Sequence, residues 1–128
     1  MPNYMLLFYA EPPASPDEEA EREAQLPVWL ELNESLAKAG LLVAGDRLHP
    51  TEMATTVRVR DGETEVTDGP FAVTKEVLGG YYLLDCSNLD EALKVAARVP
   101  LANFGSVEVR PVMDLSQVLA ERKAAASA

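Results

Sequence analysis

Apolar and polar residues recur along the chain with two different periods, and the switches between these periods predict the elements of the fold. Residues 4–10 (YMLLFYA) form a short, nearly continuous apolar run that predicts a buried strand. Residues 41–44 (LLVA), 81–86 (YYLLDC) and 106–112 (SVEVRPV) predict three further strands. Pro111 favours an edge position or a strand end for the last of these, because proline cannot donate a ladder hydrogen bond.

A first helical region follows the first strand and carries a clear start signal. Ser15 is the expected N-cap, Pro16 occupies the first helical position, and Glu18 completes a capping box. Pro27 predicts a kink or a break in this region, since a proline inside a helix removes one hydrogen bond. Beyond Pro27, apolar residues recur at helical spacing as far as Ala39.

Two later helices are also indicated. Ser87 or Asn88 is the expected cap of the second region, which ends before Pro100. Asp114 opens a last short helix, and we expect the Ala- and Ser-rich tail from Ala124 to be frayed.

The strongest local prediction is a β-hairpin. Residues 56–60 (TVRVR) and 63–67 (ETEVT) flank an Asp-Gly dipeptide at positions 61–62, which is a strong two-residue turn signal. In this register opposite charges face each other on one side of the hairpin, and valines face each other on the other side. The expected pairs are Arg60 with Glu63, Arg58 with Glu65, and Val57 with Val66.

The order of elements predicts an α+β fold of the ferredoxin-like type. Without the extra hairpin, the order is strand, helix, strand, strand, helix, strand, which is the split β-α-β motif. We expect a single domain over residues 1–123. Two helices cover one face of such a sheet, and a second copy of the same sheet is the simplest cover for the other. The sequence therefore favours a homodimer, of the dimeric α+β barrel type.

Composition narrows the classes of function. The formal net charge of −10 argues against a nucleic-acid or membrane partner, because both need clustered Lys and Arg. Cys86 is the one cysteine and His49 the one histidine, so neither an internal disulfide nor a Cys/His zinc site is expected. We predict no metal and no cofactor. No targeting signal is recognisable, which makes the cytoplasm the default expectation.

Residues 68–80 (DGPFAVTKEVLGG) resemble the signature of the DGPF family, a bacterial branch of the YCII-related superfamily whose pattern is close to DGPFxETKExxGG. Further similarity is found at residues 39–50 (AGLLVAGDRLHP), 90–97 (DEALKVAA) and 107–112 (VEVRPV). Val73 stands where the family usually has Glu. The resemblance implies a ferredoxin-like fold that dimerises through its sheet.

The resemblance also bears on function. In the YCII branch a His and an Asp are proposed as an acid–base pair, and at least one member resembles a dechlorinating enzyme for hydroxylated aromatics. Trp29 takes the place of that His, and the acid falls near Glu11 or Pro12, so the pair is not kept. Tryptophan cannot exchange a proton near neutral pH. Related genes often lie beside genes for sigma factors, which suggests association with a sigma factor in a stress circuit.

Asp68 is the first candidate for a functional residue. It is either a general base at the mouth of a cleft or a turn residue whose carboxylate binds nearby backbone N–H groups. His49, in a loop after the second strand, is a weak catalytic candidate because it titrates near neutral pH, and the alternative is an exposed loop residue.

Five further residues are candidates for ligand binding. Lys75 and Glu76 are adjacent, so on a strand they would point to opposite faces. Lys75 is suited to binding an anion and Glu76 to acting as an acid, and the alternative for each is a surface ion pair. Trp29 and Tyr9 are suited to stacking on a flat ligand between helix and sheet, and the alternative for Trp29 is the core. Arg110 is suited to binding a carboxylate, or else to an ion pair.

Three functions therefore compete: a small-molecule-binding or enzyme-like domain, an interaction protein of a sigma-factor circuit, and a ligand sensor without turnover. The sequence favours the first, with its cleft near Asp68, and leaves the ligand and the presence of catalysis undecided. Cys86 is interpreted as a small buried hydrophobe, since no activating neighbour is visible.

Overall fold

Four strands pair into one antiparallel sheet, and two more form a separate hairpin. The computed structural model describes residues 2–127. The strands are β1 (Asn3–Ala10), β2 (Leu42–Arg47), β3 (Thr55–Arg60), β4 (Glu63–Asp68), β5 (Val77–Asp85) and β6 (Ser106–Pro111). The large sheet has the order β2-β5-β1-β6, and β3 pairs with β4. This strand order, with helices between the strands, is the ferredoxin-like arrangement predicted from the sequence.

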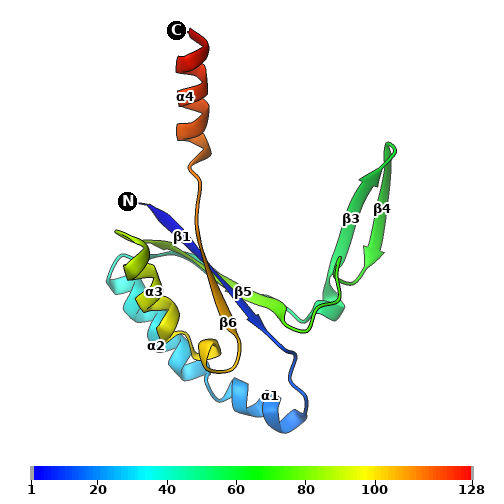
Figure 1. The fold of residues 1–128 in the computed structure, drawn as a ribbon. Helices are drawn as coiled ribbons and strands as arrows, with labels where there is room; N and C mark the ends of the chain where they lie inside the picture. The colour runs from blue at the N-terminus through cyan, green and yellow to red at the C-terminus, as the bar shows by residue number, and fades with distance from the viewer. Residues whose placement is uncertain (1, 128) are drawn as a thin grey trace.

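The helices lie between and after these strands. They are α1 (Pro16–Glu23), α2 (Leu26–Lys38), α3 (Leu89–Arg98) and α4 (Leu115–Ser127), with single 3-10 turns η1 (Thr51–Met53) and η2 (Pro100–Asn103). Helices α2 and α3 cover one face of the sheet (Figure 1). Among the described residues, no helix is both long and apolar enough to cross a membrane.

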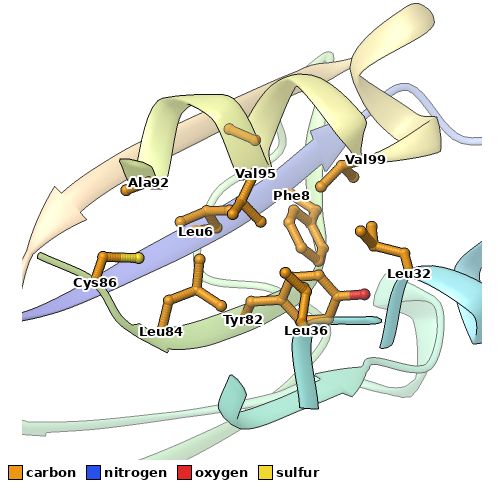
Figure 2. Close-up of a cluster of buried hydrophobic side chains, with 11 residues drawn as sticks. Leu6, Phe8, Leu32, Leu36, Tyr82, Leu84, Cys86, Ala92, Val95 and Val99 are labelled. Carbon is orange, nitrogen blue, oxygen red and sulfur yellow. The ribbon is translucent and has the colours of Figure 1, made fainter. Parts of the chain in front are cut away.

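The core lies between the sheet and these two helices (Figure 2). Alternate residues of the central strands point into it, so that Leu6 and Phe8 of β1 meet Leu84 of β5. Leu36 of α2 is 1% exposed, and burying a side chain of this size stabilises the fold by about 1.5–3 kcal/mol. Cys86 is fully buried in the same cluster, as expected, and burial raises the pKa of its thiol.

Tyr82 adds a polar group to this core. Its ring packs edge-on against Phe8, with centroids 5.1 Å apart, and its hydroxyl donates to Oδ1 of Asn33 on α2. Burial raises the pKa of Tyr82 to about 12. The hydrogen bond allows the hydroxyl to leave water without the cost of an unpaired polar group.

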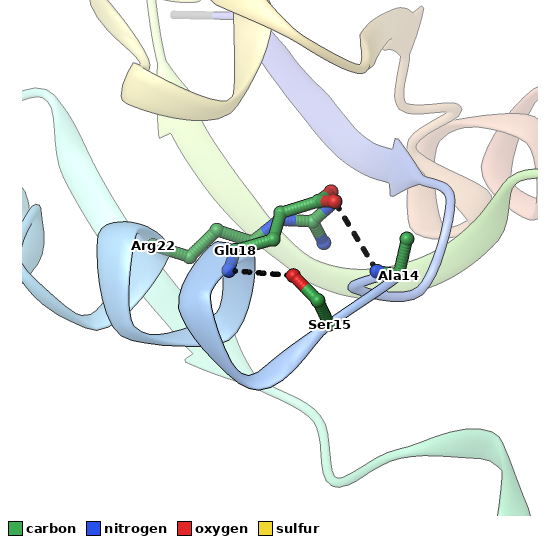
Figure 3. A network of polar contacts seen from close by, with 4 residues as sticks. All are labelled: Ala14, Ser15, Glu18 and Arg22. Atoms are coloured by element: carbon green, nitrogen blue, oxygen red, sulfur yellow. Dashed lines mark hydrogen bonds and ion pairs between the residues drawn. The ribbon is translucent and has the colours of Figure 1, made fainter.

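The predicted helix caps are confirmed. The backbone N–H of Glu18 donates to Oγ of Ser15 at 3.1 Å, and the Glu18 carboxylate accepts from the N–H of Ala14 at 3.2 Å (Figure 3). Asn88 caps α3 by accepting from the N–H of Glu91. The break predicted at Pro27 is also present: α1 ends at Glu23, and the proline lies in the first turn of α2.

The predicted hairpin forms in the predicted register, with Val57 opposite Val66 and Arg58 opposite Glu65. Asp61 and Gly62 both have positive φ angles, of 53° and 78°, as the tight turn requires. The hairpin stands away from the rest of the molecule (Figure 1), and every residue of β4 is exposed. We refer to β3 and β4 together as the arm.

Two local predictions were wrong. Strand β5 begins at Val77 instead of Tyr81, so Gly79 and Gly80 belong to the strand. A Cβ at Gly80 would lie 2.8 Å from the carbonyl oxygen of Asp46, so glycine is needed here for close approach of the backbones. Helix α4 continues through the tail to Ser127, which agrees with the high helix propensity of alanine.

Candidate functional site

The sheet face that α2 and α3 leave uncovered, called here the open face, carries two rows of side chains that cross all four strands. Residues paired across strands share a face, so the pairing registers define each row. The first row contains Ala44, Leu83, Met5 and Arg110. The second row contains Asp46, Tyr81, Leu7 and Glu108. Both rows are apolar in the centre and end in charged or small residues at the edge strands.

One contact in the second row joins the edge strand β2 to the centre of the sheet. The hydroxyl of Tyr81 donates to Oδ2 of Asp46 at 2.8 Å. This hydrogen bond, together with the negative charge of Asp46, raises the pKa of Tyr81. The phenol is therefore held protonated as a hydrogen-bond donor and is not poised to act as a base.

A polar cluster lies at one end of the open face, where β1 ends and β5 and β6 begin. It consists of Tyr9, Glu11, Lys75, Glu76 and Ser106. Oγ of Ser106 donates to the Glu76 carboxylate, at 3.1 Å from Oε2, and Nζ of Lys75 lies 3.3 Å from Oε1 of Glu11. Tyr9 pairs with Ser106 across the β1–β6 ladder, so their side chains share the open face. Two predicted residues that are adjacent in sequence thus have partners in different segments: Lys75 pairs with Glu11, just after β1, and Glu76 with Ser106 of β6.

Lys75 and Glu76 do not lie on a strand, as the sequence suggested, because β5 begins one residue later. The side chain of Thr74 donates to the carbonyl oxygen of Glu76 at 2.7 Å, which fixes the backbone just before the strand. This turn lets the two side chains diverge. The charge of Lys75 is largely exposed, whereas Glu76 is half-buried against β6.

Asp68 lies at the end of β4, on the arm, opposite Thr55. The turn that follows it is held by backbone and hydroxyl contacts: the N–H of Gly69 donates to the carbonyl of Ala54 at 2.7 Å, and Thr56 Oγ1 donates to the carbonyl of Gly69 at 2.8 Å. Gly69 has a φ of +97°, a conformation that favours glycine. The Asp-Gly part of the signature therefore builds the junction between the arm and the following loop.

The remaining predicted site residues are dispersed. Trp29 packs on the core side, with its ring 5.4 Å from Phe8 and 6.1 Å from Tyr82. Tyr9 follows Phe8 on β1 and points to the opposite face, so Trp29 and Tyr9 cannot stack on the same ligand. His49 is exposed in the loop after β2, and Arg110 is exposed in the first row of the open face.

Two surface hollows lie elsewhere. One, of about 520 Å³, is lined by α2 residues that include Glu31 and Lys38. The other, of about 550 Å³, lies between α1 and η2, where the guanidinium of Arg22 stacks 4.6 Å above the ring of Phe104. None of the predicted site residues lines either hollow. Within residues 2–127, no group of three or more His, Cys, Asp or Glu side chains is arranged to hold a metal ion.

Several residues of the open face were not singled out from the sequence: Ser106, Glu108, Asp46 and Tyr81. The alternation of residues 106–112 was a usable signal, because it places Ser106, Glu108 and Arg110 on one side of the strand. The partners of these residues come from distant segments, however, and no local pattern reveals them.

Comparison with known proteins agrees with the fold. The YCII-related domain family matches residues 3–116, which is most of the chain. The chain belongs to this family. An uncharacterized protein of Rhizobium meliloti (strain 1021) is similar, at 54% identity over 77 residues. That similarity covers 59% of this YCII-family chain and 62% of the relative, so the chain spans about three-fifths of the length of the curated relative it matches.

Proposed function

We propose that this YCII-family chain is a small-molecule-binding, enzyme-like domain that works as a homodimer and holds its ligand at the polar cluster. The observation that carries the proposal is the contact between Glu76 and Ser106, 3.1 Å long, on the open face beside Tyr9. It brings an acidic acceptor, a hydroxyl and an aromatic ring together on the face of the sheet away from the core, where they do not contribute to core packing. This position replaces the cleft expected near Asp68.

The chemistry of the cluster favours a flat molecule that carries hydrogen-bond donors. The Glu76 carboxylate accepts hydrogen bonds and attracts an amine or a hydroxyl, and the ring of Tyr9 offers an apolar surface for stacking. Lys75 already has a carboxylate partner in Glu11, so it is available to an acidic group only if that pair opens. A phenol or an aromatic amine fits these groups better than a polyanion does.

The homodimer is supported by apolar surface that the single chain leaves uncovered. The arm exposes Val57, Val59 and Val66 to about three-fifths of their area or more, and Leu115 and Leu119 of α4 are about two-thirds exposed. Isolated hairpins and helices of this length are marginal in water without packing. The buried, unpaired Cys86 suits a reducing compartment such as the cytoplasm.

A second candidate is a dimeric interaction protein without a ligand, in a sigma-factor circuit. The exposure of Phe71 and Val73, at 77% and 99%, favours it, because large apolar side chains left in water close to each other in sequence suit a protein-binding site. These two residues lie in the loop between the arm and β5. The two candidates differ in whether small molecules bind at the polar cluster.

A screen of phenols, aromatic amines and aromatic acids by ligand-observed NMR separates the candidates. We expect phenols or aromatic amines to bind the wild-type protein and to bind Glu76→Gln markedly less. Asp68→Asn is the matched control, because it makes the same chemical change on the arm and should leave binding unchanged. Loss of binding in Asp68→Asn alone would return the site to the arm. A well-folded dimer that binds no member of the panel would favour the interaction protein.

A further inference from the structure

The charged and apolar side chains in the two rows of the open face favour one orientation of a second copy over another. Facing sheets pack with their strands either roughly aligned or roughly orthogonal. In the aligned class the two-fold axis of the pair lies in the plane between the sheets, either along the strands or across them. The two choices bring different charged residues together. The arrangement of Asp46, Glu108 and Arg110 decides between them.

An axis along the strands places each row over the same row of the partner, with the order of the strands reversed. In the second row, Glu108 of one protomer then lies over the partner's Asp46, and the symmetry repeats this contact. Both residues are carboxylates in an interface that excludes water. Like charges facing each other in this way oppose association.

An axis that runs across the strands, midway between the two rows, lays each strand over its own copy and exchanges the rows. Arg110 then lies over the partner's Glu108, twice in the dimer. The centre of the interface becomes apolar, because Met5 lies over the partner's Leu7 and Leu83 lies over the partner's Tyr81. Charge and apolar surface are both complementary in this arrangement, and so it is favoured over the first.

This register has a consequence for the polar cluster. Alternate residues of a strand share a face, so two positions beyond Arg110 bring the partner's Val112 over Ser106. Val112 is held in line with the sheet by its N–H, which donates to the carbonyl of Asn3 at 2.9 Å. Val112 and Met113 are 42% and 69% exposed in the single chain, so their apolar surface is available to pack against a partner.

We infer that the segment from Val112 to Leu115 of a second copy covers the polar cluster, so that the ligand site is completed by the partner subunit. This inference rests on the homodimer proposed above. In this arrangement one wall of the site at Glu76 and Ser106 belongs to the other protomer. The apolar side chains of Val112, Met113 and Leu115 exclude water there and strengthen the hydrogen bonds of a ligand to Glu76, while the Asp114 carboxylate accepts from the N–H groups of its own helix. The open end of the sheet thereby becomes an enclosed, composite site.

Cross-linking of the full chain tests the inference. Ser106→Cys with Val112→Cys should give a covalent dimer with a short bis-maleimide, which spans the roughly 10 Å between facing sheets. Within one chain these positions are six residues apart on a strand, roughly 20 Å, and cannot be joined. Asp46→Cys with Glu108→Cys is the matched control for the other axis. Its two positions are roughly 14 Å apart across the sheet of one chain and are farther apart between protomers in the favoured arrangement, so peptide mapping should find no bridge from position 46 of one protomer to position 108 of the other.

The outcomes separate the inference from the homodimer. Wild-type protein is the background control, because its buried Cys86 should not react. A bridge between position 46 of one protomer and position 108 of the other would overturn the inference and establish the other axis. Light scattering that shows a dimer in both variants, without cross-linking of the first pair, would also overturn it while leaving the homodimer intact. A monomer at all concentrations would overturn both.

Discussion

Glu76 and Ser106 are thirty residues apart in sequence, yet the Ser106 hydroxyl donates to the Glu76 carboxylate at 3.1 Å. The contact ties the end of the signature segment to the edge strand β6. It also orients one carboxylate oxygen, and the other, at 3.4 Å from the same hydroxyl, is less tightly held. A ligand donor can therefore approach Glu76 without displacing Ser106.

Replacing Ser106 by Ala should weaken ligand binding by removing the group that orients Glu76. A net hydrogen bond is worth about 0.5–1.5 kcal/mol, so the dissociation constant should rise by about 2- to 13-fold. Titration calorimetry with the best binder of the aromatic panel measures the change. Ser106→Thr keeps the hydroxyl and suits a strand, so it should restore binding. Equal losses in both variants would show that Ser106 matters for space and not for its hydroxyl.

The sequence predicts the elements of this fold well, because their signals are local. Each confirmed signal depends on a few neighbouring residues and on backbone preferences. These signals are the Asp61-Gly62 turn, the Ser15 and Asn88 caps, and the break at Pro27. One failed prediction, the start of β5, had a non-local cause. Gly80 lies before the predicted strand but belongs to β5, where the close approach of β2 requires glycine.

The candidate site was predictable only in part. The signature pointed to Lys75 and Glu76, and the structure places both in the polar cluster. Their partners are Glu11, which follows β1, and Ser106 of β6, and the pairing of these distant strands brings both there. Pairing of this kind is set by packing of the whole sheet, so a single sequence does not reveal it. Asp68 was chosen as a candidate because it belongs to the signature. The sequence did not show that it lies on the arm.

Reversing one charge on β6 should separate the protomers, and reversing both should rejoin them. Glu108→Arg places Arg over the partner's Arg110, and Arg110→Glu places Glu over the partner's Glu108. We expect each single variant to raise the dimer dissociation constant at least about tenfold, roughly 1.4 kcal/mol, and the double variant to approach wild type. Sedimentation equilibrium at low salt measures this. Additive losses in the double variant would contradict contact between the two positions.

The valines of the arm should contribute to the dimer even though the single chain leaves them exposed. Val57→Thr with Val66→Thr keeps two β-branched residues but removes apolar surface, so the hairpin should persist while the dimer weakens about tenfold, roughly 1.4 kcal/mol. Arg58→Gln, on the opposite side of the arm, is the control and should have little effect. Unchanged dimerisation in the valine variant would show that the arm stays in solvent.

Leu36→Ala should be among the most destabilising single changes in α2. The side chain is 1% exposed at the centre of the core, and removing a buried Leu typically costs about 2–5 kcal/mol. Leu30→Ala makes the same change in the same helix at a residue that is 62% exposed, and should cost about 0.5 kcal/mol or less. Urea unfolding followed by circular dichroism gives both values. Similar costs at the two positions would contradict the packing of α2 described above.

Tyr82 should make the stability of the protein depend on pH in the alkaline range. Burial raises its pKa from 10.0 to about 12, so the folded chain keeps the phenol proton after the unfolded chain has lost it. The unfolded state then binds fewer protons, and the free energy of unfolding falls as the pH rises from about 10 towards 12. Below pH 10 both states are protonated, and this contribution is fully present.

Tyr82→Phe removes the ionisable group and so should flatten this alkaline decline. At neutral pH the variant should be less stable by about 0.5–1.5 kcal/mol, because Asn33 loses the hydroxyl that donates to it. Its disadvantage should shrink as the pH passes 10, since only the wild-type chain has a proton to lose at this position. Urea unfolding of both proteins at neutral pH and in the lower half of the range from about pH 10 to 12 measures how the free energy of unfolding of each depends on pH. If they stay parallel, the Tyr82 hydroxyl is as accessible to water in the folded chain as in the unfolded one.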